Sequence, residues 1–346
     1  MEQIDPRIKG AENVAEYLGQ QLGVPSDQIT ISLLQGGYSN LTYLVKVDRE
    51  KSYILRRPPL GMKITKAHDM AREYRLLKAL ENAKFKKIPK PVLCCEDESV
   101  WGSPFFLMEK VTGTILRNKV PEGKEFNAEY FHRLSVKATD GLLELHRIDL
   151  VSTGLEKLGA PENYVSRQIT GWSERYQKSK TEHIEAMELI SNWLNSNIPT
   201  DKASALIHND FKYDNLVLKN GEPEILAILD WEMATIGDPL MDLGTTLAYW
   251  AEARDEPILQ QFNLSHIPGN MDRSEVIAYY GSHSHIKLDK ILFYYVFGVF
   301  KVAVIAQQIF KRYSMGDAPD PRFGALIEVV KACSRKALKS IDTQKI

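Results

Sequence analysis

The sequence predicts an α+β protein in which a small, β-rich N-terminal part precedes a larger, mainly helical C-terminal part. Two observations favour this class. In the first third of the chain, short apolar runs alternate with turn residues, whereas long segments after about residue 110 carry apolar residues at helical spacing. At 346 residues, the chain can bury a core in each part. We predict an N-terminal domain over 1–109 and a C-terminal domain over 110–346.

The N-terminal part is expected to form a mostly antiparallel sheet of five strands with one helix. The strands are predicted at 29–34, 41–47, 53–56, 92–95 and 104–109. The helix is predicted at 67–80, because Met70, Tyr74, Leu77 and Leu80 fall on one stripe of a helix.

The C-terminal part is expected to be helical around a compact β-rich segment at 205–231. Helices are predicted at 127–147 and 163–197, and everything after Asp242 is predicted to be helical. The longest apolar run, from Ile291, is interrupted by Lys301 and is shorter than a membrane span requires. We therefore expect it to form a buried core helix.

Charge and cysteine content narrow the class of partner. The chain has 44 basic and 45 acidic residues, and this balance offers no field that would attract nucleic acid or an anionic membrane. Three cysteines are too few and odd in number for a secreted disulfide framework. The first residues lack the basic start and apolar core of a signal peptide. We expect a cytoplasmic protein, and the composition leaves its oligomeric state open.

The strongest functional signal follows the predicted strand near residue 206. His208 and Asp210 are separated by one residue, Asn215 follows five residues after Asp210, and Asp230 comes fifteen residues later. Two apolar runs joined by Lys-Asn-Gly-Glu lie between Asn215 and Asp230, and they predict a hairpin that returns Asp230 to the neighbourhood of Asn215. These residues could be turn residues alone, but the combination of spacing, hairpin and second carboxylate favours a functional site.

This set of residues suits phosphoryl transfer from ATP or GTP. Mg²⁺ prefers oxygen ligands, and Asn215 and Asp230 are predicted to supply them. Asp210 is predicted to orient the acceptor hydroxyl and to accept its proton, while His208 braces the loop backbone by hydrogen bonds. The predicted partners are thus a nucleoside triphosphate and a small-molecule hydroxyl acceptor.

Residues 207–244 resemble the catalytic and metal-binding motifs of the aminoglycoside phosphotransferase and choline kinase superfamily. The resemblance implies a bilobal, protein-kinase-like fold in which Asp210 is the catalytic aspartate and Asn215 and Asp230 are metal ligands. Asp238 and Asp242 are similar to a later acidic segment of the family, which implies a largely structural role.

The resemblance also includes the segment that ends at His146, which is similar to a family helix ending in Leu-His-x-x-Asp, and we expect a buried histidine there. In all, it covers roughly residues 30–310.

A glycine-containing loop is predicted where the nucleotide phosphates would be covered. Gly36 and Gly37 would let backbone N–H groups approach phosphate, and Ser39 or Asn40 would donate further hydrogen bonds. A plain hairpin turn is the alternative interpretation.

Two further segments resemble nucleotide-binding parts of the family. Arg56 stands on the strand that usually carries the kinase lysine, and Glu73 stands on the helix that carries its partner, although a solvated helix face is an alternative for Glu73. An arginine can bridge phosphate oxygens through its planar fork. The backbone of Glu109 and Val111 is expected to meet the purine.

The sequence Arg-Arg-Pro-Pro at 56–59, in which Arg56 ends a predicted strand, resembles that of one subgroup of this superfamily. This subgroup is related to the kinase-like domain of acyl-CoA dehydrogenase fusion proteins.

Three functions remain under consideration. We favour an active small-molecule kinase. A nucleotide-binding pseudokinase or regulatory module is an alternative, because Arg56 stands at the usual position of the kinase lysine. A protein kinase is disfavoured, because Asp230 is followed by Trp-Glu and no Ala-Pro-Glu segment follows.

The resemblance implies that the acceptor pocket is built from residues 243–346, and the charge of this region narrows the class of acceptor. Residues 243–346 hold 13 Lys or Arg and 10 Asp or Glu, which argues against a polycationic acceptor. The subgroup resemblance favours a hydroxyacyl-CoA or hydroxy acid, and an amino alcohol or aminoglycoside is the alternative.

Overall fold

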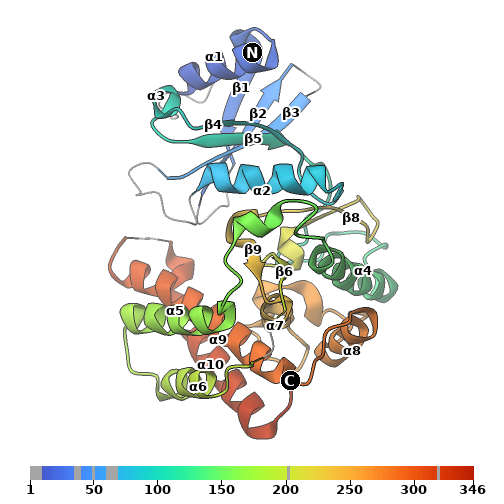
Figure 1. The fold of residues 1–346 in the computed structure, drawn as a ribbon, viewed down its shortest axis with the longest axis vertical. Coiled ribbons are helices and arrows are strands. Elements are labelled where there is room, and N and C mark those ends of the chain that lie inside the picture. Colours follow the sequence, from blue (N-terminus) through green and yellow to red (C-terminus); the bar gives the residue numbers. More distant parts are fainter. Residues whose placement is uncertain (1–9, 35–39, 49–50, 60–68, 201–202, 318–319) are drawn as a thin grey trace. The chain divides into compact units, whose positions relative to one another are not determined.

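The computed structural model describes residues 10–34, 40–48, 51–59, 69–200, 203–317 and 320–346. The predicted loop residues Gly36, Gly37 and Ser39 therefore lie outside the described part of the chain. The chain separates into two compact units (Figure 1). Unit 1 consists of Met1–Thr112 and Leu226–Met233, and unit 2 consists of Gly113–Ile225 and Ala234–Ile346.

Unit 1 is built on a five-stranded sheet in which every neighbouring pair of strands is antiparallel. The strand order is β1-β2-β3-β5-β4. Their bounds are β1 (Ile29–Leu33), β2 (Leu41–Val47), β3 (Lys51–Arg57), β4 (Pro91–Cys95) and β5 (Phe105–Glu109). All five predicted strands are present, which confirms the predicted sheet.

The helices that accompany this sheet in the described part of unit 1 are α1 (Ala11–Leu22), α2 (Met70–Asn82) and α3 (Glu98–Trp101). The predicted helix α2 begins at Met70 rather than residue 67, because the Asp69 carboxylate caps it by accepting a hydrogen bond from the Arg72 N–H at 2.9 Å. The helices α1 and α3 were not predicted. The four-residue spacing of Val14, Leu18 and Leu22 is the sequence signal for α1.

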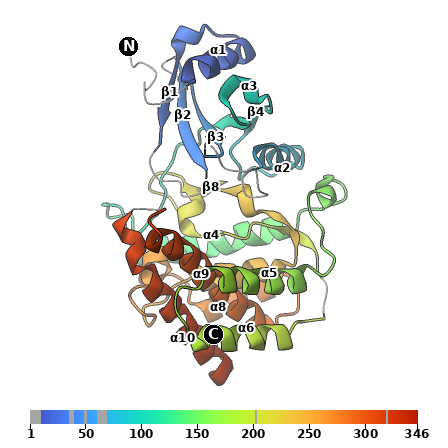
Figure 2. The same cartoon turned by 90° about the vertical axis from the view of Figure 1, so that its left-hand side faces the viewer.

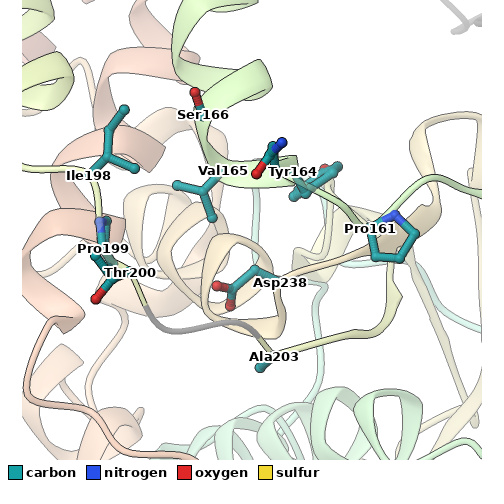
Figure 3. A pocket seen from close by; sticks show the side chains of 10 residues that line it. Pro161, Tyr164, Val165, Ser166, Ile198, Pro199, Thr200, Ala203 and Asp238 are labelled. Atoms are coloured by element: carbon teal, nitrogen blue, oxygen red, sulfur yellow. The ribbon is translucent and has the colours of Figure 1, made fainter.

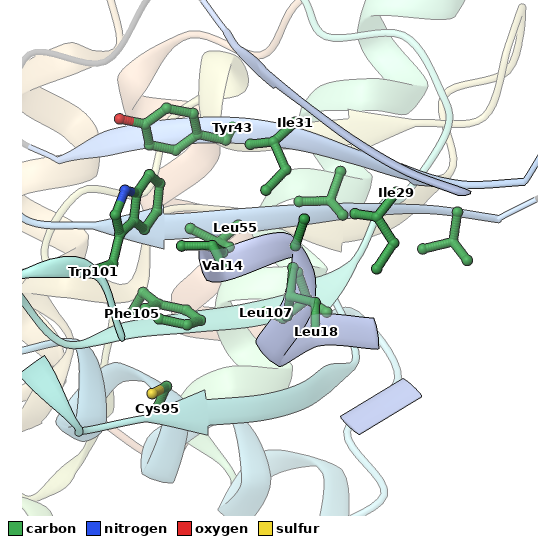
Figure 4. Packing of buried hydrophobic residues seen from close by; sticks show 13 residues of the cluster. Val14, Leu18, Ile29, Ile31, Tyr43, Leu55, Cys95, Trp101, Phe105 and Leu107 are labelled. Carbon is green, nitrogen blue, oxygen red and sulfur yellow. The ribbon is translucent and has the colours of Figure 1, made fainter. Parts of the chain in front are cut away.

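The helix α1 covers one face of the sheet through a buried hydrophobic cluster (Figures 2 and 4). The cluster includes Val14, Leu18, Ile31, Tyr43, Leu55, Trp101, Phe105 and Leu107. The helix α2 packs instead against β4 and β5. Since side chains alternate along a strand, Leu55 enters the cluster under α1 while its neighbour Arg56 points to the other face. This alternation directs Arg56 toward α2.

Unit 2 is mainly helical. Its helices are α4 (Ala128–His146), α5 (Tyr164–Ser179), α6 (Glu185–Ser196), α7 (Pro239–Tyr249), α8 (Arg273–His283), α9 (Ile291–Ser314) and α10 (Leu326–Thr343). The short strands are β6 (Ala205–Ile207), β7 (Leu216–Leu218), β8 (Ile225–Ile228) and β9 (Thr235–Gly237), of which β8 continues into unit 1. Strands β7 and β8 form the predicted hairpin, and β9, which was not predicted, pairs with β6.

The prediction that everything after Asp242 is helical is wrong for the segment between α7 and α8. This segment contains only turns and short 3-10 helices. Pro257, Pro268 and Gly269 disfavour a continuous helix there. The segment is held by side chains instead, since the Trp250 indole N–H donates to the carbonyl of Met271 at 2.8 Å.

The apolar run from Ile291 belongs to α9, which packs against α5, α6, α7 and α10. By length and composition alone α9 could cross a membrane, contrary to the expectation that the run is too short, but 78% of its most apolar stretch is buried inside the protein. The packing accounts for the apolar composition, and the predicted buried core helix is confirmed.

The crossing of α7 and α9 depends on two glycines. A methyl group at Gly298 would lie 2.2 Å from the carbonyl oxygen of Gly244, and one at Gly244 would lie 2.2 Å from the carbonyl oxygen of Tyr294. Backbone atoms cannot give way as a flexible side chain can, so both positions require the absence of a side chain.

We predict that Gly298→Ala lowers the free energy of unfolding by about 2 kcal/mol or more, because the added methyl group would push α9 away from α7. Gly171→Ala on α5 is the matched control. Its methyl group would meet only the end of the Arg175 side chain at 3.3 Å, so this change should be neutral or stabilise by up to about 1 kcal/mol. Urea unfolding of both variants measures the change in the free energy of unfolding. Equal stability of the two would contradict the predicted close crossing.

Candidate active site

The candidate catalytic loop of unit 2 connects β6 to β7 and is held by one buried carboxylate. Asp242, on α7, accepts hydrogen bonds from the backbone N–H groups of His208 at 2.6 Å and of Asn209 at 2.7 Å. Asn209 has a positive φ of 67°, so the chain turns sharply immediately before Asp210. The two bonds fix this turn and therefore the direction of the Asp210 side chain.

A histidine completes the surroundings of Asp242. The Nε2 atom of His146, at the end of α4, lies 3.1 Å from the Asp242 carboxylate, and its Nδ1 atom lies 2.9 Å from the hydroxyl of Tyr280. Burial raises the pKa of Asp242, but the hydrogen bonds and charge of its partners outweigh this and lower the pKa below its ordinary value. His146 is buried, as expected for the end of this helix.

A lysine from the apolar helix α9 supports the loop at its carbonyl. Lys301 Nζ donates to the carbonyl oxygen of Asn209 at 2.6 Å and lies 5.7 Å from the centre of the Trp172 ring. Burial lowers the pKa of Lys301 to about 8, although the charges of Asp210 and Asp242 act in the opposite direction. Lys301 is therefore an amine kept in the core for its contact with the loop.

The side chain of Asp210 is oriented by two neighbours in the loop. The amide nitrogen of Asn215 donates to the Asp210 carbonyl at 2.8 Å and to its Oδ2 at 2.9 Å. Lys212 Nζ lies 3.3 Å from the same Oδ2 and 4.8 Å from the centre of the Tyr249 ring. Burial lowers the pKa of Lys212, but the nearby charge of Asp210 helps to raise it above its ordinary value, so the amine stays protonated.

His208 is fully buried and contacts the backbone of the same loop. Its Nδ1 atom accepts a hydrogen bond from the N–H of Asp210 at 3.3 Å. The structure thus brings His208, Asp210 and Asn215 together within unit 2.

In unit 1, three carboxylates surround the side chain of Arg56. Its Nη1 donates to Glu73 Oε1 at 2.8 Å, and its Nη2 donates to Asp230 Oδ1 at 3.1 Å and to Glu232 Oε2 at 3.2 Å. Glu73 is only 2% exposed, so the alternative of a solvated helix face is excluded. The amide nitrogen of Asn40 donates to the same Glu232 oxygen at 2.7 Å.

Burial and the charges of neighbouring side chains act in opposite directions on the pKa values of Arg56 and Glu73. Burial lowers the pKa of Arg56, but Glu73, Asp230 and Glu232 raise it above its ordinary value, so the arginine stays charged. Burial raises the pKa of Glu73 to about 7, against the lowering by Arg56. The four side chains carry a formal charge of −2 when all three acids are ionised, and the nearby Arg72 offsets part of it.

The residues predicted to hold Mg²⁺ suit a hard cation. Because the Asn215 amide nitrogen is turned toward Asp210, its oxygen is the atom that can coordinate a metal. The Asp230 side chain is 39% exposed and lies in the acidic cluster of unit 1. Within the described ranges, no group of three or more His, Cys, Asp or Glu side chains is arranged to hold a metal. Binding of Mg²⁺ by Asn215 and Asp230 stays a prediction.

The segment predicted to meet the purine begins at the end of β5. The Glu109 N–H donates to the carbonyl of Lys90 at 2.8 Å, the Lys110 N–H donates to that of Ser52 at 3.1 Å, and Val111 follows outside any strand. Contact of Glu109 and Val111 with a purine stays a prediction.

A cavity of about 340 Å³ lies in unit 2 beside the start of α5 (Figure 3). Tyr164 in its wall is hydrogen bonded through its hydroxyl to the side chain of Asn209. Asp238, also in the wall, accepts hydrogen bonds from the N–H of Leu240 and from the hydroxyl of Tyr294. One residue of the cavity wall, Tyr164, therefore contacts the residue that precedes Asp210.

The sequence did not identify Lys212 or Glu232, which contact predicted residues, or Lys301, which contacts the loop at Asn209. Lys212 and Glu232 each stand two positions after a predicted aspartate, and Lys301 is the charge that interrupts the longest apolar run. These positions were the available signals, but the sequence alone did not connect them with a particular partner.

The fold, the loop that carries Asp210 in unit 2 and the acids around Arg56 in unit 1 define the class of protein, which is a kinase-like phosphotransferase. The model of the phosphotransferase enzyme family (APH) matches residues 30–275. The chain belongs to this family, as the resemblance in its motifs implied.

Among curated relatives, human acyl-CoA dehydrogenase family member 11 is 34% identical over 317 residues, which is 89% of this chain. The chain spans about 40% of the length of that relative.

Two solved structures have the same fold. One is a putative aminoglycoside phosphotransferase from Ralstonia eutropha, with a TM-score of 0.78, 28% identity and coverage of 95% of this chain and 98% of that one. The other is an aminoglycoside phosphotransferase, APH(2″), solved as its GDP and kanamycin complex. It has a TM-score of 0.64 and 18% identity, and the match covers 93% of this chain and 98% of that one.

We predict that Lys301→Met changes the pH dependence of stability. In the folded protein Lys301 loses its proton near pH 8, whereas an unfolded lysine holds it until about pH 10.4. Between these values the unfolded state binds more protons, so the wild type becomes more stable as pH rises. From pH 7 to 10, its free energy of unfolding should rise relative to that of the variant by up to about 3 kcal/mol. Urea unfolding across this range measures the difference, and a constant difference would contradict the account.

Proposed function

We propose that this protein is a small-molecule kinase that transfers the γ-phosphate of ATP or GTP to an acceptor hydroxyl. The observation that carries the proposal is the arrangement at Asp210. Asn215 and Lys212 both contact Oδ2 of this carboxylate, and the loop beneath it is fixed by Asp242. A carboxylate oriented in this way serves to position an acceptor hydroxyl and to receive its proton.

Each residue near Asp210 has a separate part in the proposed reaction. Asp210 Oδ1 receives the proton of the acceptor hydroxyl as the hydroxyl oxygen bonds to the γ-phosphorus. The bond from that phosphorus to the oxygen bridging to the β-phosphate breaks, and ADP or GDP leaves. The Lys212 ammonium offsets negative charge on the phosphoryl group being transferred. Asn215 holds Asp210 through its amide nitrogen and offers its oxygen to a cation.

Residues of unit 1 would handle the nucleotide. Arg56 would contact phosphate oxygens while Glu73 holds it in place. Asn215 and Asp230 would hold Mg²⁺, which when bound offsets the charge of the phosphates. The backbone at Glu109 and Val111 would meet the purine.

We propose a nucleotide and a small acceptor as the two substrates by analogy with the fold. A structural relative is described as a complex with GDP and kanamycin, and at its level of identity this likeness shows the fold alone.

For the acceptor, we favour a neutral or anionic hydroxyl compound, with a hydroxyacyl-CoA as the leading candidate and a hydroxy acid as the next. The region from residue 243 onward has a slight basic excess, which does not favour a polycation. Several sequence relatives are acyl-CoA dehydrogenase family members, and a kinase related to such proteins would act on a related thioester. We also propose that the protein works in the cytoplasm.

A second candidate function is a nucleotide-binding regulatory module without catalysis. Arg56 at the usual lysine position favours it, whereas the pairing of Arg56 with Glu73 and the oriented Asp210 favour an active enzyme.

The proposal is tested by offering 4-hydroxyacyl-CoA, choline and kanamycin separately, with Mg²⁺ and either ATP or GTP. We expect acceptor-dependent release of ADP or GDP with the hydroxyacyl-CoA. Asp210→Asn should lower that turnover about a thousandfold while leaving nucleotide affinity nearly unchanged, because Asp210 acts on the acceptor.

Phosphorylation of kanamycin alone would overturn the acceptor assignment. Nucleotide binding without transfer to any acceptor would favour the regulatory module, and near-normal turnover of Asp210→Asn would remove Asp210 from the role of base.

A further inference from the structure

Both terminal nitrogens of Arg56 are engaged by carboxylates of unit 1. Nη1 is bound by Glu73 at 2.8 Å, whereas Nη2 is shared between Asp230 at 3.1 Å and Glu232 at 3.2 Å. A lysine ammonium is a single point of charge, and one carboxylate suffices to hold it. The planar guanidinium has two ends, and its far end needs a second acid if its orientation is to be fixed.

The backbone around Glu232 directs its side chain to this far end. Asp230 has a positive φ of 63°, and the chain then forms a short 3-10 turn over Trp231–Met233. Trp231 anchors the turn, since it is 1% exposed, packs edge-on against Phe85 and donates its indole N–H to the carbonyl of Ile228 at 2.8 Å. Glu232 therefore projects from a turn whose base is held in the core of unit 1.

Glu232 is also fixed at its carboxylate. The same Oε2 atom that accepts from Arg56 accepts from the Asn40 amide at 2.7 Å, and the Glu232 side chain is only 13% exposed. Solvent therefore screens its contact with Arg56 weakly. Glu232 thus connects the arginine of β3, the residue just before β2 and the segment that follows Asp230.

We propose that Glu232 is a second positioning residue for Arg56 beside Glu73, and that the full contribution of arginine at position 56 depends on this acid. The inference rests on the proposed function, in which Arg56 contacts the nucleotide phosphates. Without Glu232, Nη2 has Asp230 as its remaining carboxylate partner, and Asp230 is the residue proposed to hold the cation. Glu232 therefore keeps Arg56 in place while leaving Asp230 available to Mg²⁺.

A double-mutant cycle with Arg56→Lys and Glu232→Gln in this chain tests the coupling. Calorimetry measures nucleotide affinity with and without Mg²⁺, and steady-state kinetics with the accepted substrate measure kcat and KM. In the Arg56 background, Glu232→Gln should lower kcat about tenfold with little change in the KM of the acceptor. It should also reduce the gain in nucleotide affinity given by Mg²⁺ by about tenfold.

In the Arg56→Lys background, the same Glu232→Gln change should alter both quantities by less than about threefold, because an ammonium held by Glu73 does not depend on residue 232. Glu81→Gln is the matched control. Its carboxylate pairs with Lys78 at 2.7 Å at the surface of α2, so neither quantity should change. Glu232→Asp, which keeps the charge but shortens the side chain, is a second probe should Glu232→Gln fold poorly, and it should show a smaller loss.

Equal effects of Glu232→Gln in the two backgrounds would overturn the proposed coupling, as would the absence of any effect in the wild-type background. Both outcomes leave the proposed function intact as long as the wild type binds nucleotide. A wild type that binds no nucleotide would overturn the proposed function and this inference together.

Discussion

The buried carboxylate of Asp242 is the constraint on which the candidate catalytic loop depends. Removing a charge from water is costly unless hydrogen bonds replace the lost solvation. Asp242 obtains them from two successive backbone N–H groups of the loop and from His146. If the loop turned away, this buried charge would lose both of its backbone hydrogen bonds. The helix that carries Asp242 is fixed in turn by its glycine crossing with α9, and α9 supplies Lys301 to the carbonyl of Asn209.

In unit 1 the buried charge is positive instead of negative. The guanidinium of Arg56 is hydrogen bonded to three carboxylates. Arg56 is 8% exposed and contacts residues from α2 and from the segment after β8. An arginine in place of lysine therefore does not by itself indicate a lost activity. The second end of the guanidinium is bound by a second carboxylate, that of Glu232 in the same unit. This carboxylate suits an arginine at the usual position of the kinase lysine.

The sequence predicted the parts of this protein that depend on local patterns. Alternating apolar residues located the five strands, and the Asn-Gly turn located the hairpin after Asn215. It predicted less well where contacts span the chain, because Arg56 and Glu232 are separated by 176 positions, and no local pattern joins them. The helix predicted for the segment after α7 is absent, because proline and glycine residues within it disfavour a continuous helix. The helix α1 was missed although its spacing was visible.

A crystal structure with Mg²⁺ and a non-hydrolysable ATP or GTP analogue tests the central claim most directly, namely that Asp210, Asn215 and Asp230 serve one phosphoryl-transfer reaction. The account predicts an ion with the Asn215 amide oxygen and an Asp230 oxygen at about 2.1 Å, Arg56 at the phosphates, and Asp210 facing the γ-phosphate without binding the metal. An ion that is bound by neither Asn215 nor Asp230, or a nucleotide whose γ-phosphate lies far from Asp210, would contradict it.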